Sequence, residues 1–441
     1  MKIILSTYNY YPANSGGTEV YTRGLGNFLQ KKGYEVIIVA AADAPGDIAT
    51  EVLLEDDTAR AIRYTIEGLT VVGMSLKDRS LDSLYTFEKE SWTAFYTKLL
   101  PLTGFGAADL LLMNGISGVS GLSLAKAFRG GNTINKIAVV VHTPFFCTKG
   151  DMLFANGTAR CGEIIAPATC ASCQLAAKTG LPHALISAVS PLLKGAGRLM
   201  RHPLLGNIDR LLQKCLDDLK EIAGMSEYWI VFSNDMAGFL QKQSFPGASR
   251  LRVIRHGIDR KLFGSKGRDL PVETTFVYAG RFEPIKGVKL LAEAWLRTKD
   301  DKTKKKLLLA GGWDKSAYGI EVHRRLSDRG DVAFLNNLDQ FALAGLYKKV
   351  HCAIVPSRWV ETGPLIIHEA VASGCDVITS DIGGQNELAG FYAGQVTTFS
   401  NGDIDSLVNA IEQYRPSGKS LEDLVTDQEK HYGQVADLLI Q

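Results

Sequence analysis

The chain has 441 residues, of which 46% are hydrophobic and 22% are charged, and its formal net charge is +2. This length exceeds what one hydrophobic core usually holds, so we expect two domains or three, and the near balance of charge argues against nucleic acid as a partner. No stretch reaches the roughly 18 apolar residues of a membrane span, and MKIILSTYNYYP has the pattern of a first strand rather than a signal peptide, so we expect a soluble, cytoplasmic protein.

Short apolar strands alternate with helical patterns along the whole chain. The first half contains KIILSTY, EVIIVAA, LTVVGMS, ADLLLMN, KIAVVVHT and YWIVFSN, and the second half contains TTFVYAG, KKLLLAGG, DVAFLN, CAIVPS, DVITS and QVTTF. Continuous apolar runs are typical of strands buried on both faces of a parallel sheet. The two sets predict an α/β protein in which two doubly wound, Rossmann-like domains face each other across a cleft.

The polar stretch FGSKGRDLPVE, residues 263–273, is the best candidate for the region that separates the two sets of strands. We take residues 1–255 as an N-terminal domain, with a cysteine-containing insertion over residues 144–222, and residues 256–415 as a second domain. Residues 416–441 have an amphipathic pattern, and we expect them to form a helix that packs back toward the N-terminal domain.

A pair of glycines follows the first predicted strand. In open α/β sheets ligands bind beyond the carboxyl ends of the strands, so the residues at those ends are candidates for a binding site. Gly16 and Gly17 lie there, just before a helical pattern, where glycine lets backbone N–H groups approach an anion at a helix N-terminus. A plain tight turn explains the pair equally well, since the dinucleotide fingerprint and the Walker lysine are both missing.

Two cations follow the first strand of the second domain, in the loop YAGRFEPIKG. Arg281 and Lys286 lie five positions apart between two glycines. This arrangement suits a diphosphate, because arginine offers a planar fork of donors and lysine a point charge. Solvated surface charges are the alternative.

Two glutamates, Glu361 and Glu369, lie eight positions apart in ETGPLIIHEAVASG. The composition of residues 361–364 is that of a loop, and the residues from Leu365 onward have the apolar density of a buried helix. A carboxylate in such a helix is costly unless a polar group meets it, so a ligand that carries hydroxyl groups is one candidate partner. A neighbouring arginine or a backbone amide is the other.

Five segments, in this order and at this spacing, resemble the retaining glycosyltransferases of family 4, which have the GT-B fold. They are GGTEVYTRGLGNFL, VIRHGID, YAGRFEPIKG, LLLAGG and ETGPLIIHEAVASG. The resemblance covers nearly the whole chain, and its most specific part is the E-x7-E element of Glu361 and Glu369. It implies that the second domain holds a nucleotide sugar and that the first holds the acceptor.

The resemblance also implies roles for single residues. Arg281 and Lys286 would contact the donor diphosphate and stabilise the charge that grows as the sugar leaves. Glu369 would accept hydrogen bonds from the ribose hydroxyls, Glu361 would face the donor sugar, and His142 would touch that sugar. Further donor contacts are implied for the glycine loop of the first domain and for the backbone of the loop after Glu361, namely Gly16, Gly17, Thr362, Gly363, Pro364 and Leu365.

The implied reaction moves a sugar from a nucleotide diphosphate to a hydroxyl group with retention at the anomeric carbon. Either the acceptor attacks on the face that the diphosphate leaves, or Glu361 acts as a covalent nucleophile. A UDP-sugar is the expected donor, with GDP- and ADP-sugars as alternatives, and no metal is required for the diphosphate. The expected acceptor is a glycan or a lipid-linked molecule, in the synthesis of a polysaccharide, glycolipid or other glycoconjugate.

Four of the seven cysteines lie close together after His142. Cys147, Cys161, Cys170 and Cys173 could form a tetrahedral structural zinc site, since they include a C-x2-C pair. Free thiols are the main alternative, because disulfides are disfavoured in a reducing cytoplasm. By its position we expect this segment to shape the acceptor site.

The stretch after these cysteines is basic and apolar. Lys194, Arg198, Arg201, Arg210 and Lys214 accompany a single acid there. Such a stretch suits a peripheral contact with an anionic membrane on the cytoplasmic side, where a lipid-linked acceptor would reside. A helix with a solvated basic face explains the pattern equally well.

Two other functional classes compete with an active transferase. A non-catalytic relative that binds a nucleotide sugar would be expected to lose Arg281, Lys286 or Glu369, and all three are present. A GT-B nucleotide-sugar epimerase is disfavoured by the E-x7-E element.

Overall fold

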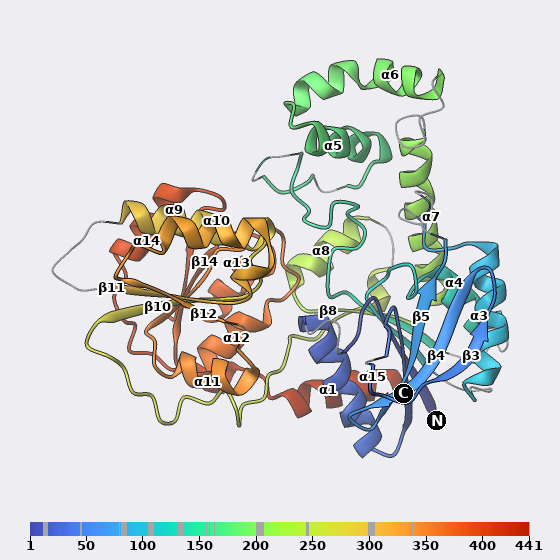
Figure 1. Ribbon diagram of the computed structural model, residues 1–441, viewed down its shortest axis with the longest axis horizontal. Coiled ribbons are helices and arrows are strands. Elements are labelled where there is room, and N and C mark those ends of the chain that lie inside the picture. Colours follow the sequence, from blue (N-terminus) through green and yellow to red (C-terminus); the bar gives the residue numbers. More distant parts are fainter. Residues whose placement is uncertain are drawn as a thin grey trace.

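The protein folds into two α/β domains and a projecting helical lobe (Figure 1). Each domain is built on a twisted, largely parallel sheet, so the predicted fold class of two doubly wound domains is confirmed. The computed structural model describes residues 1–11, 16–44, 46–78, 80, 86–104, 110–130, 136–155, 157, 159–162, 164–199, 207–243, 247–298, 305–336 and 338–440.

The first sheet has, within the described residues, nine strands in the order β3-β4-β5-β2-β1-β6-β7-β8-β9. Its parallel strands are β1 (Lys2–Thr7), β2 (Glu35–Ala40), β5 (Leu69–Leu76), β6 (Leu110–Asn114), β7 (Lys136–Val140), β8 (Tyr228–Val231) and β9 (Leu251–Val253). At one edge β3 (Glu51–Glu55) and β4 (Ala59–Ile66) pair antiparallel, and β4 is antiparallel to β5. The central strands are apolar and buried because helices cover both faces.

Helices α1 (Gly17–Lys31), α3 (Glu90–Leu102), α4 (Leu122–Gly130) and α8 (Asn234–Lys242) belong to this domain. In α1 the spacing of Tyr21, Leu25 and Leu29 places one apolar side chain on the same face in each turn, and all three are buried in the core beside β1. The packing of this face fixes the N-terminus of α1 at the carboxyl end of β1.

The lobe lies between β7 and β8 in the sequence and contains α5 (Pro167–Thr179), α6 (His183–Leu199) and α7 (Ile208–Met225). Helix α7 packs into the first domain through Leu219 and Ile222, among others. Helices α5 and α6 stand clear of both sheets at the top of the view (Figure 1).

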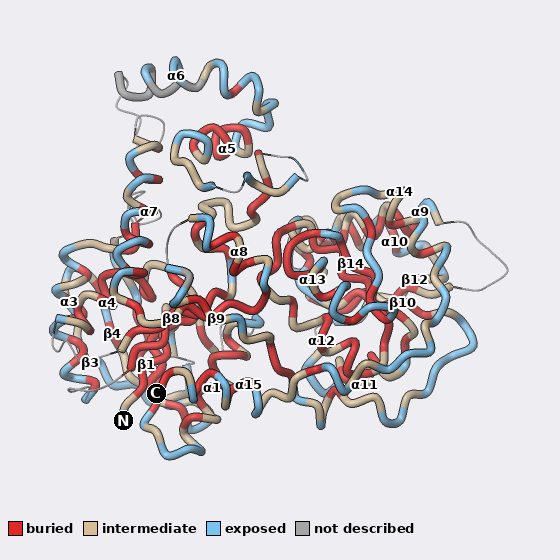
Figure 2. Tube along the Cα trace, turned by 180° about the vertical axis from the view of Figure 1, so that it is seen from behind, coloured by how far each residue is buried: buried red, intermediate tan, exposed pale blue. Residues whose placement is uncertain are grey.

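The second sheet is entirely parallel in the order β12-β11-β10-β13-β14-β15. Its strands are β10 (Thr274–Ala279), β11 (Lys305–Ala310), β12 (Val332–Leu335), β13 (Cys352–Val355), β14 (Asp376–Ser380) and β15 (Val396–Phe399). Its helices are α9 (Val288–Arg297), α10 (Ala317–Leu326), α11 (Gln340–Tyr347), α12 (Leu365–Ala372), α13 (Gly383–Phe391) and α14 (Ile404–Glu412). Figure 2 shows the buried strands between layers of partly exposed helices.

The last helix, α15 (Gln428–Ile440), lies beside α1 rather than in the second domain (Figure 1). Tyr432, Val435 and Leu439 are buried in the core of the first domain. The chain therefore crosses between the domains twice, once before β10 and once before α15. Among the described residues, no helix is both long and apolar enough to cross a bilayer.

Candidate functional site

The loops after β10 and β13 meet at the carboxyl edge of the second sheet. Their backbones are joined because the N–H of Arg358 donates to the carbonyl oxygen of Ile285 at 2.8 Å. The Lys286 ammonium group donates to the Glu361 carboxylate at 2.7 Å and lies 4.9 Å from the centroid of the Trp359 ring. Two residues that are 75 positions apart thus form a partly buried ion pair at the place where ligands of α/β proteins bind.

The turn that carries Lys286 requires a glycine at its end. Gly287 has φ 71°, and a Cβ atom there would lie 1.9 Å from the carbonyl oxygen of Pro356. Only glycine adopts this conformation and allows this close approach at low cost. The turn is thereby held against the β13 loop, with the Lys286 side chain directed at Glu361.

The backbone of Glu361 is held by Gln385, a buried side chain near the start of α13. The Glu361 N–H donates to the Gln385 side-chain oxygen at 3.2 Å, and the Gly384 N–H donates to the Glu361 carbonyl oxygen at 2.9 Å. The Gln385 amide group in turn donates to the carbonyl oxygen of Ser357 and to the hydroxyl of Ser380, both at 3.2 Å. The loop position of Glu361 is therefore fixed by backbone contacts that do not involve its carboxylate.

Glu369 lies on α12, about one turn from the start of the helix at Leu365. Its side chain is half-buried, and burial raises the pKa of the carboxyl to about 7. In the part of the chain that the structure describes, no side chain or backbone group donates a hydrogen bond to the Glu369 carboxyl. Burial raises the pKa of the neighbouring Tyr347 hydroxyl, and the negative charge of Glu369 raises it further. The site therefore contains a carboxyl group whose hydrogen-bonding capacity is available to a ligand.

Arg281 shares this edge of the sheet but faces solvent. Its guanidinium group donates to Glu283 at 2.9 Å, and 63% of the side chain is exposed. Across the cleft, Glu19 in the first turn of α1 is buried; burial raises the pKa of its carboxyl, and the positive charge of Arg281 acts against that rise. Arg281 is thus within electrostatic reach of the first domain, although it does not contact Lys286 or Glu361.

The glycine loop of the first domain faces the loop after β13. Gly16 caps α1, and a Cβ atom at Gly17 would lie 3.7 Å from the Leu365 side chain at the start of α12. Pro364 caps α12 at the same place. Residues 12–15, which precede the glycines, lie outside the described residues.

The two domains touch directly at Thr362 and Gly363. The Thr362 hydroxyl donates to the carbonyl oxygen of His142 at 2.7 Å. A Cβ atom at Gly363 would lie 2.6 Å from Cβ of Phe232 and 3.2 Å from Cδ2 of His256, so this position has room for a hydrogen atom only. The loop that carries Glu361 is therefore packed against the first domain.

His142 belongs to an aromatic cluster at this contact. Its ring centroid lies 4.6 Å from that of Tyr21 and 5.0 Å from that of Phe232. Burial, and to a smaller extent the charge of His431, lowers the pKa of His142 to about 3, so the imidazole is neutral at ordinary pH. Its Nε2 atom is buried and has no hydrogen-bond partner among the described residues. The structure thus places His142 beside the Glu361 loop with one ring nitrogen unpaired.

The cysteines of the insertion do not support the zinc site predicted from their spacing. Cys147, Cys161, Cys170 and Cys173 are all free thiols, and burial raises the pKa of Cys161 to about 12 and that of Cys170 to about 11. Within the described ranges no group of three or more His, Cys, Asp or Glu side chains is placed to hold a metal ion. Cys173 instead accepts a hydrogen bond from the Ala155 N–H at 3.1 Å.

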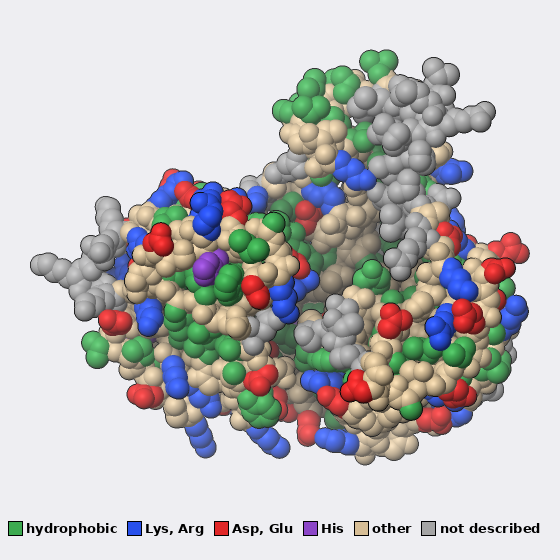
Figure 3. Space-filling view, viewed as in Figure 1, with side chains coloured by type: hydrophobic (Ala, Val, Ile, Leu, Met, Phe, Trp, Pro, Cys, Tyr) green, Lys and Arg blue, Asp and Glu red, His purple; other side chains and the backbone are tan. Residues whose placement is uncertain are grey.

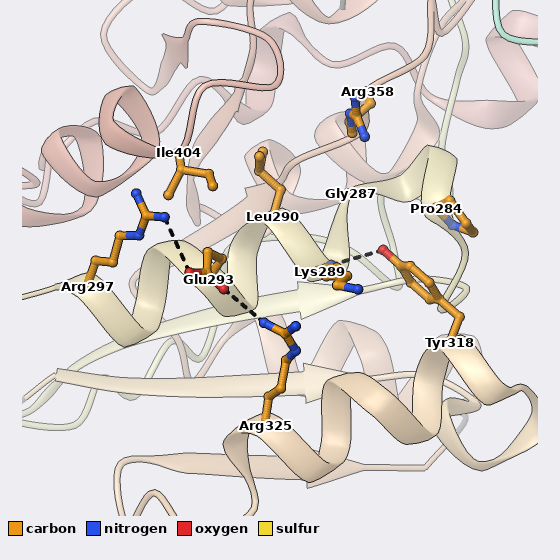
Figure 4. Close-up of a pocket in the computed structure, with 10 residues that line it drawn as sticks. All are labelled: Pro284, Gly287, Lys289, Leu290, Glu293, Arg297, Tyr318, Arg325, Arg358 and Ile404. Atoms are coloured by element: carbon orange, nitrogen blue, oxygen red, sulfur yellow. Dashed lines mark hydrogen bonds and ion pairs between the residues drawn. The ribbon is translucent and has the colours of Figure 1, made fainter. Parts of the chain in front are cut away.

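Two open cavities lie near this edge of the sheet. One, of about 360 Å³, covers the outer face of α9 between α10 and α14, and Figure 4 shows Glu293 between Arg297 and Arg325, with ion-pair distances of 3.3 and 3.0 Å. The other, of about 320 Å³, lies between the domains and is lined by residues that include Arg160 and Asp381. The described residues that line them include none of those predicted for the donor site.

Three residues of the site were not predicted from the sequence. Gln385 could have been found, because it follows a glycine pair at the end of the buried strand DVITS. Glu19 could have been found in the same way, because it directly follows the Gly16 loop. His431 had no local signal, because it reaches the site from α15, where its imidazole donates to the carbonyl oxygen of Arg255 at 2.8 Å.

Sequence comparison finds likeness over part of the chain. Residues 267–431 match the family model of the glycosyl transferases group 1. Glycogen synthase of Mycobacterium tuberculosis is 31% identical over 145 residues, 32% of this chain and 34% of that protein. D-inositol 3-phosphate glycosyltransferase 2 of Catenulispora acidiphila is 32% identical over 123 residues, 26% of this chain and 29% of that protein. The matched segment spans about a third of the length of these curated relatives.

Structure comparison extends the likeness to the whole chain. Sucrose-phosphate synthase from Thermosynechococcus elongatus has a TM-score of 0.67 at 19% identity, with 99% of this chain and 98% of that chain covered. Alr3699/HepE from Anabaena, in complex with UDP, has a TM-score of 0.61 at 14% identity, with both chains fully covered. At these identities the likeness establishes architecture alone. The chain has the GT-B fold, and its residues 267–431 are similar to the glycosyl transferases group 1.

Proposed function

We propose that this protein is a retaining glycosyltransferase of family 4 that transfers a sugar from a nucleotide diphosphate sugar to a hydroxyl group of a glycan or lipid-linked acceptor. One observation carries the proposal: the Lys286–Glu361 ion pair lies at the carboxyl edge of the second sheet, and the unpaired carboxyl of Glu369 lies on the helix that follows the Glu361 loop. They lie in the segment that matches the glycosyl transferases group 1.

The donor would bind with its nucleotide in the second domain. The Lys286 ammonium group can exchange Glu361 for a diphosphate oxygen, and Arg281, which is exposed and paired only with its neighbour Glu283, can turn toward the same group. The ribose hydroxyls would donate hydrogen bonds to Glu369 and so reduce the free-energy cost of burying its carboxyl without a partner. We infer a UDP-sugar as the first donor to test, because HepE has been crystallised with UDP and glucose.

The reaction would proceed on one face of the sugar. The bond between the anomeric carbon and the diphosphate oxygen breaks while the acceptor oxygen bonds to the same carbon from the same side. The proton of the acceptor hydroxyl passes to the leaving phosphate oxygen, so no side chain need act as a nucleophile. Lys286 stabilises the negative charge that develops on the diphosphate, an effect worth roughly 100- to 1,000-fold in rate for a single well-placed donor.

Glu361 and His142 would position the donor sugar. Once Lys286 has turned to the diphosphate, the Glu361 carboxylate can accept a hydrogen bond from a sugar hydroxyl. His142 is neutral at ordinary pH, because burial lowers its pKa to about 3, and its unpaired Nε2 atom can exchange a hydrogen bond with another hydroxyl. The Gln385 side chain holds the Glu361 backbone within the second domain, and the Thr362 hydroxyl joins the same loop to the carbonyl oxygen of His142.

Calorimetric binding and hydrolysis of UDP-, GDP- and ADP-glucose test this proposal. We expect one donor to bind and to be hydrolysed slowly, and Lys286→Ala and Glu369→Gln to weaken that binding at least tenfold. Arg415→Ala and Glu273→Gln alter exposed charges of the same domain and serve as matched controls. Binding that is accompanied neither by hydrolysis nor by transfer to an acceptor would favour a non-catalytic nucleotide-sugar-binding protein. If no donor binds, the proposal is wrong.

A further inference from the structure

The tip of the helical lobe carries an apolar face that no part of the described chain covers. On its inner side, Ile186 of α6 is fully buried against Leu175, Ala176 and Ala155. On its outer side, Leu185 and Leu192 are 49% and 75% exposed. In Figure 3 hydrophobic side chains gather at this tip, and Figure 2 shows α6 as largely exposed.

The exposed side chains of α6 form a stripe along the helix. Leu185, Ala188 and Leu192 follow one another at intervals of three and four residues, which places them on one face. Leu181, just before the helix, and Ile164, at the base of the lobe, are 44% and 71% exposed. Scattered single apolar residues are normal on a protein surface, but two leucines and an alanine on one face of a projecting helix indicate an interaction surface.

The charge of the segment that carries α5 and α6 indicates what this surface meets. Residues 164–208 contain Lys178, Lys194, Arg198 and Arg201 but no aspartate or glutamate. The chain as a whole has 47 acidic residues in 441, so about five would be expected in a segment of this length. A helix that exposes leucines, in a segment whose sequence has cations and no acids, matches the interface of an anionic bilayer, where apolar side chains enter the acyl boundary and cations meet lipid phosphates.

The dimensions of α6 fit a helix that lies on a membrane. It has 17 residues, fewer than the roughly 20 that a membrane-spanning helix needs, and its sequence includes Lys194 and Arg198. It contacts the body of the protein through α5, so its outer face can reach a flat surface without a clash with either domain (Figure 1).

We propose that α6 is an interfacial helix that docks the protein on an anionic lipid bilayer through Leu185, Ala188 and Leu192. Docking does not depend on the proposed catalysis. If the proposed function holds, it places the first domain, which would bind the acceptor, next to lipid-linked molecules.

Flotation with lipid vesicles tests the proposal on the full chain. We expect the protein to bind vesicles of phosphatidylcholine that contain phosphatidylglycerol and to bind pure phosphatidylcholine at least tenfold more weakly. Raised salt should release it, because each cation near the surface contributes about a fivefold factor that salt screens. The combined Leu185→Ser and Leu192→Ser variant should bind about 100-fold more weakly, since each leucine contributes roughly tenfold.

Two further variants make the test specific. Ala188→Glu places an acid in the middle of the stripe and should abolish binding. Phe341→Ser removes a side chain that is 77% exposed on α11 of the second domain and should leave binding unchanged. Because the altered residues are exposed, the thermal midpoints should match that of the parent.

Three results would overturn the proposal. The parent protein could fail to bind anionic vesicles, the leucine variant could bind as well as the parent, or the Phe341 variant could lose binding equally. Size-exclusion chromatography tests whether a second copy of the chain occupies the stripe instead. If the parent is a dimer that does not bind vesicles, and the leucine variant is a monomer, the stripe is assigned to a second copy of the chain. The same variants should bind the sugar donor as the parent does. Measuring donor binding therefore separates a failure of membrane docking from a failure of the proposed function.

Discussion

Replacing Glu369 by glutamine should change stability in a pH-dependent way. Burial raises the pKa of this carboxyl from 4.5 to about 7, so the folded chain binds the proton more tightly than the unfolded chain does. The free energy of unfolding therefore falls as the pH rises between these two values and stays low above them. The pKa difference corresponds to about 3 kcal/mol, which we reduce to about 2 kcal/mol because water reaches part of the side chain.

Glutamine keeps the size of the side chain and carries no charge. The Glu369→Gln variant should therefore be about 2 kcal/mol more stable than the parent near pH 8.5 and close to it near pH 5. Urea unfolding of both proteins at the two pH values measures this, and Glu273→Gln, at an exposed loop position of the same domain, is the control. If the variant differs from the parent by the same amount at both pH values, Glu369 does not have a raised pKa and the argument fails.

Three substitutions at the domain contact and in the ion pair give further predictions. Gly363→Ala should lower stability by about 1–3 kcal/mol through overpacking, whereas Gly345→Ala, in an exposed helix with no atom within 4 Å of the new Cβ, should raise it slightly in the same thermal melts. Thr362→Val should cost about 1 kcal/mol because it removes a hydrogen bond across the domain contact; equal stability of variant and parent would refute this. Lys286→Met should lower stability by about 1–3 kcal/mol, because it leaves the Glu361 carboxylate buried without its cation, and Glu361→Gln in the same background should restore part of the loss if that reason is correct.

The fold was predictable where burial is complete. Every apolar run identified in the sequence forms a strand of one of the two sheets, because strands covered on both faces must be apolar throughout. The strands that were missed are β3, β4 and β9. In β4 the sequence ARAIRYTI mixes arginines with apolar residues because this strand, next to the edge strand β3, is only partly covered, and β9 has three residues, too few for a pattern.

The site was predictable only where local sequence determines it. Lys286 and Glu361 lie at strand ends and could be named, but their direct ion pair depends on how β10 and β13 are placed side by side. The packing of Gly363 against Phe232 and the arrival of His431 from α15 depend on the arrangement of the domains, which leaves no periodic signal in the chain. The cysteine spacing suggested a metal site because spacing records which residues are near in sequence, while coordination depends on the direction of each thiol.

The loop that carries Glu361 also joins the two domains, and this has a consequence for the proposed reaction. The Val360 N–H donates to the carbonyl oxygen of Asp151 at 3.0 Å and the Thr362 hydroxyl to that of His142 at 2.7 Å, so the residues on both sides of Glu361 are bonded to the first domain. Each bond contributes about 1 kcal/mol, which is small enough for the domains to separate but large enough to shift the loop when they do. Glu361 and Lys286 both belong to the second domain, where Gln385 holds the Glu361 backbone and an ion pair joins the two side chains. Domain opening would therefore remove two of the contacts that hold the Glu361 loop, and we expect this loop to be held most firmly when the domains are closed.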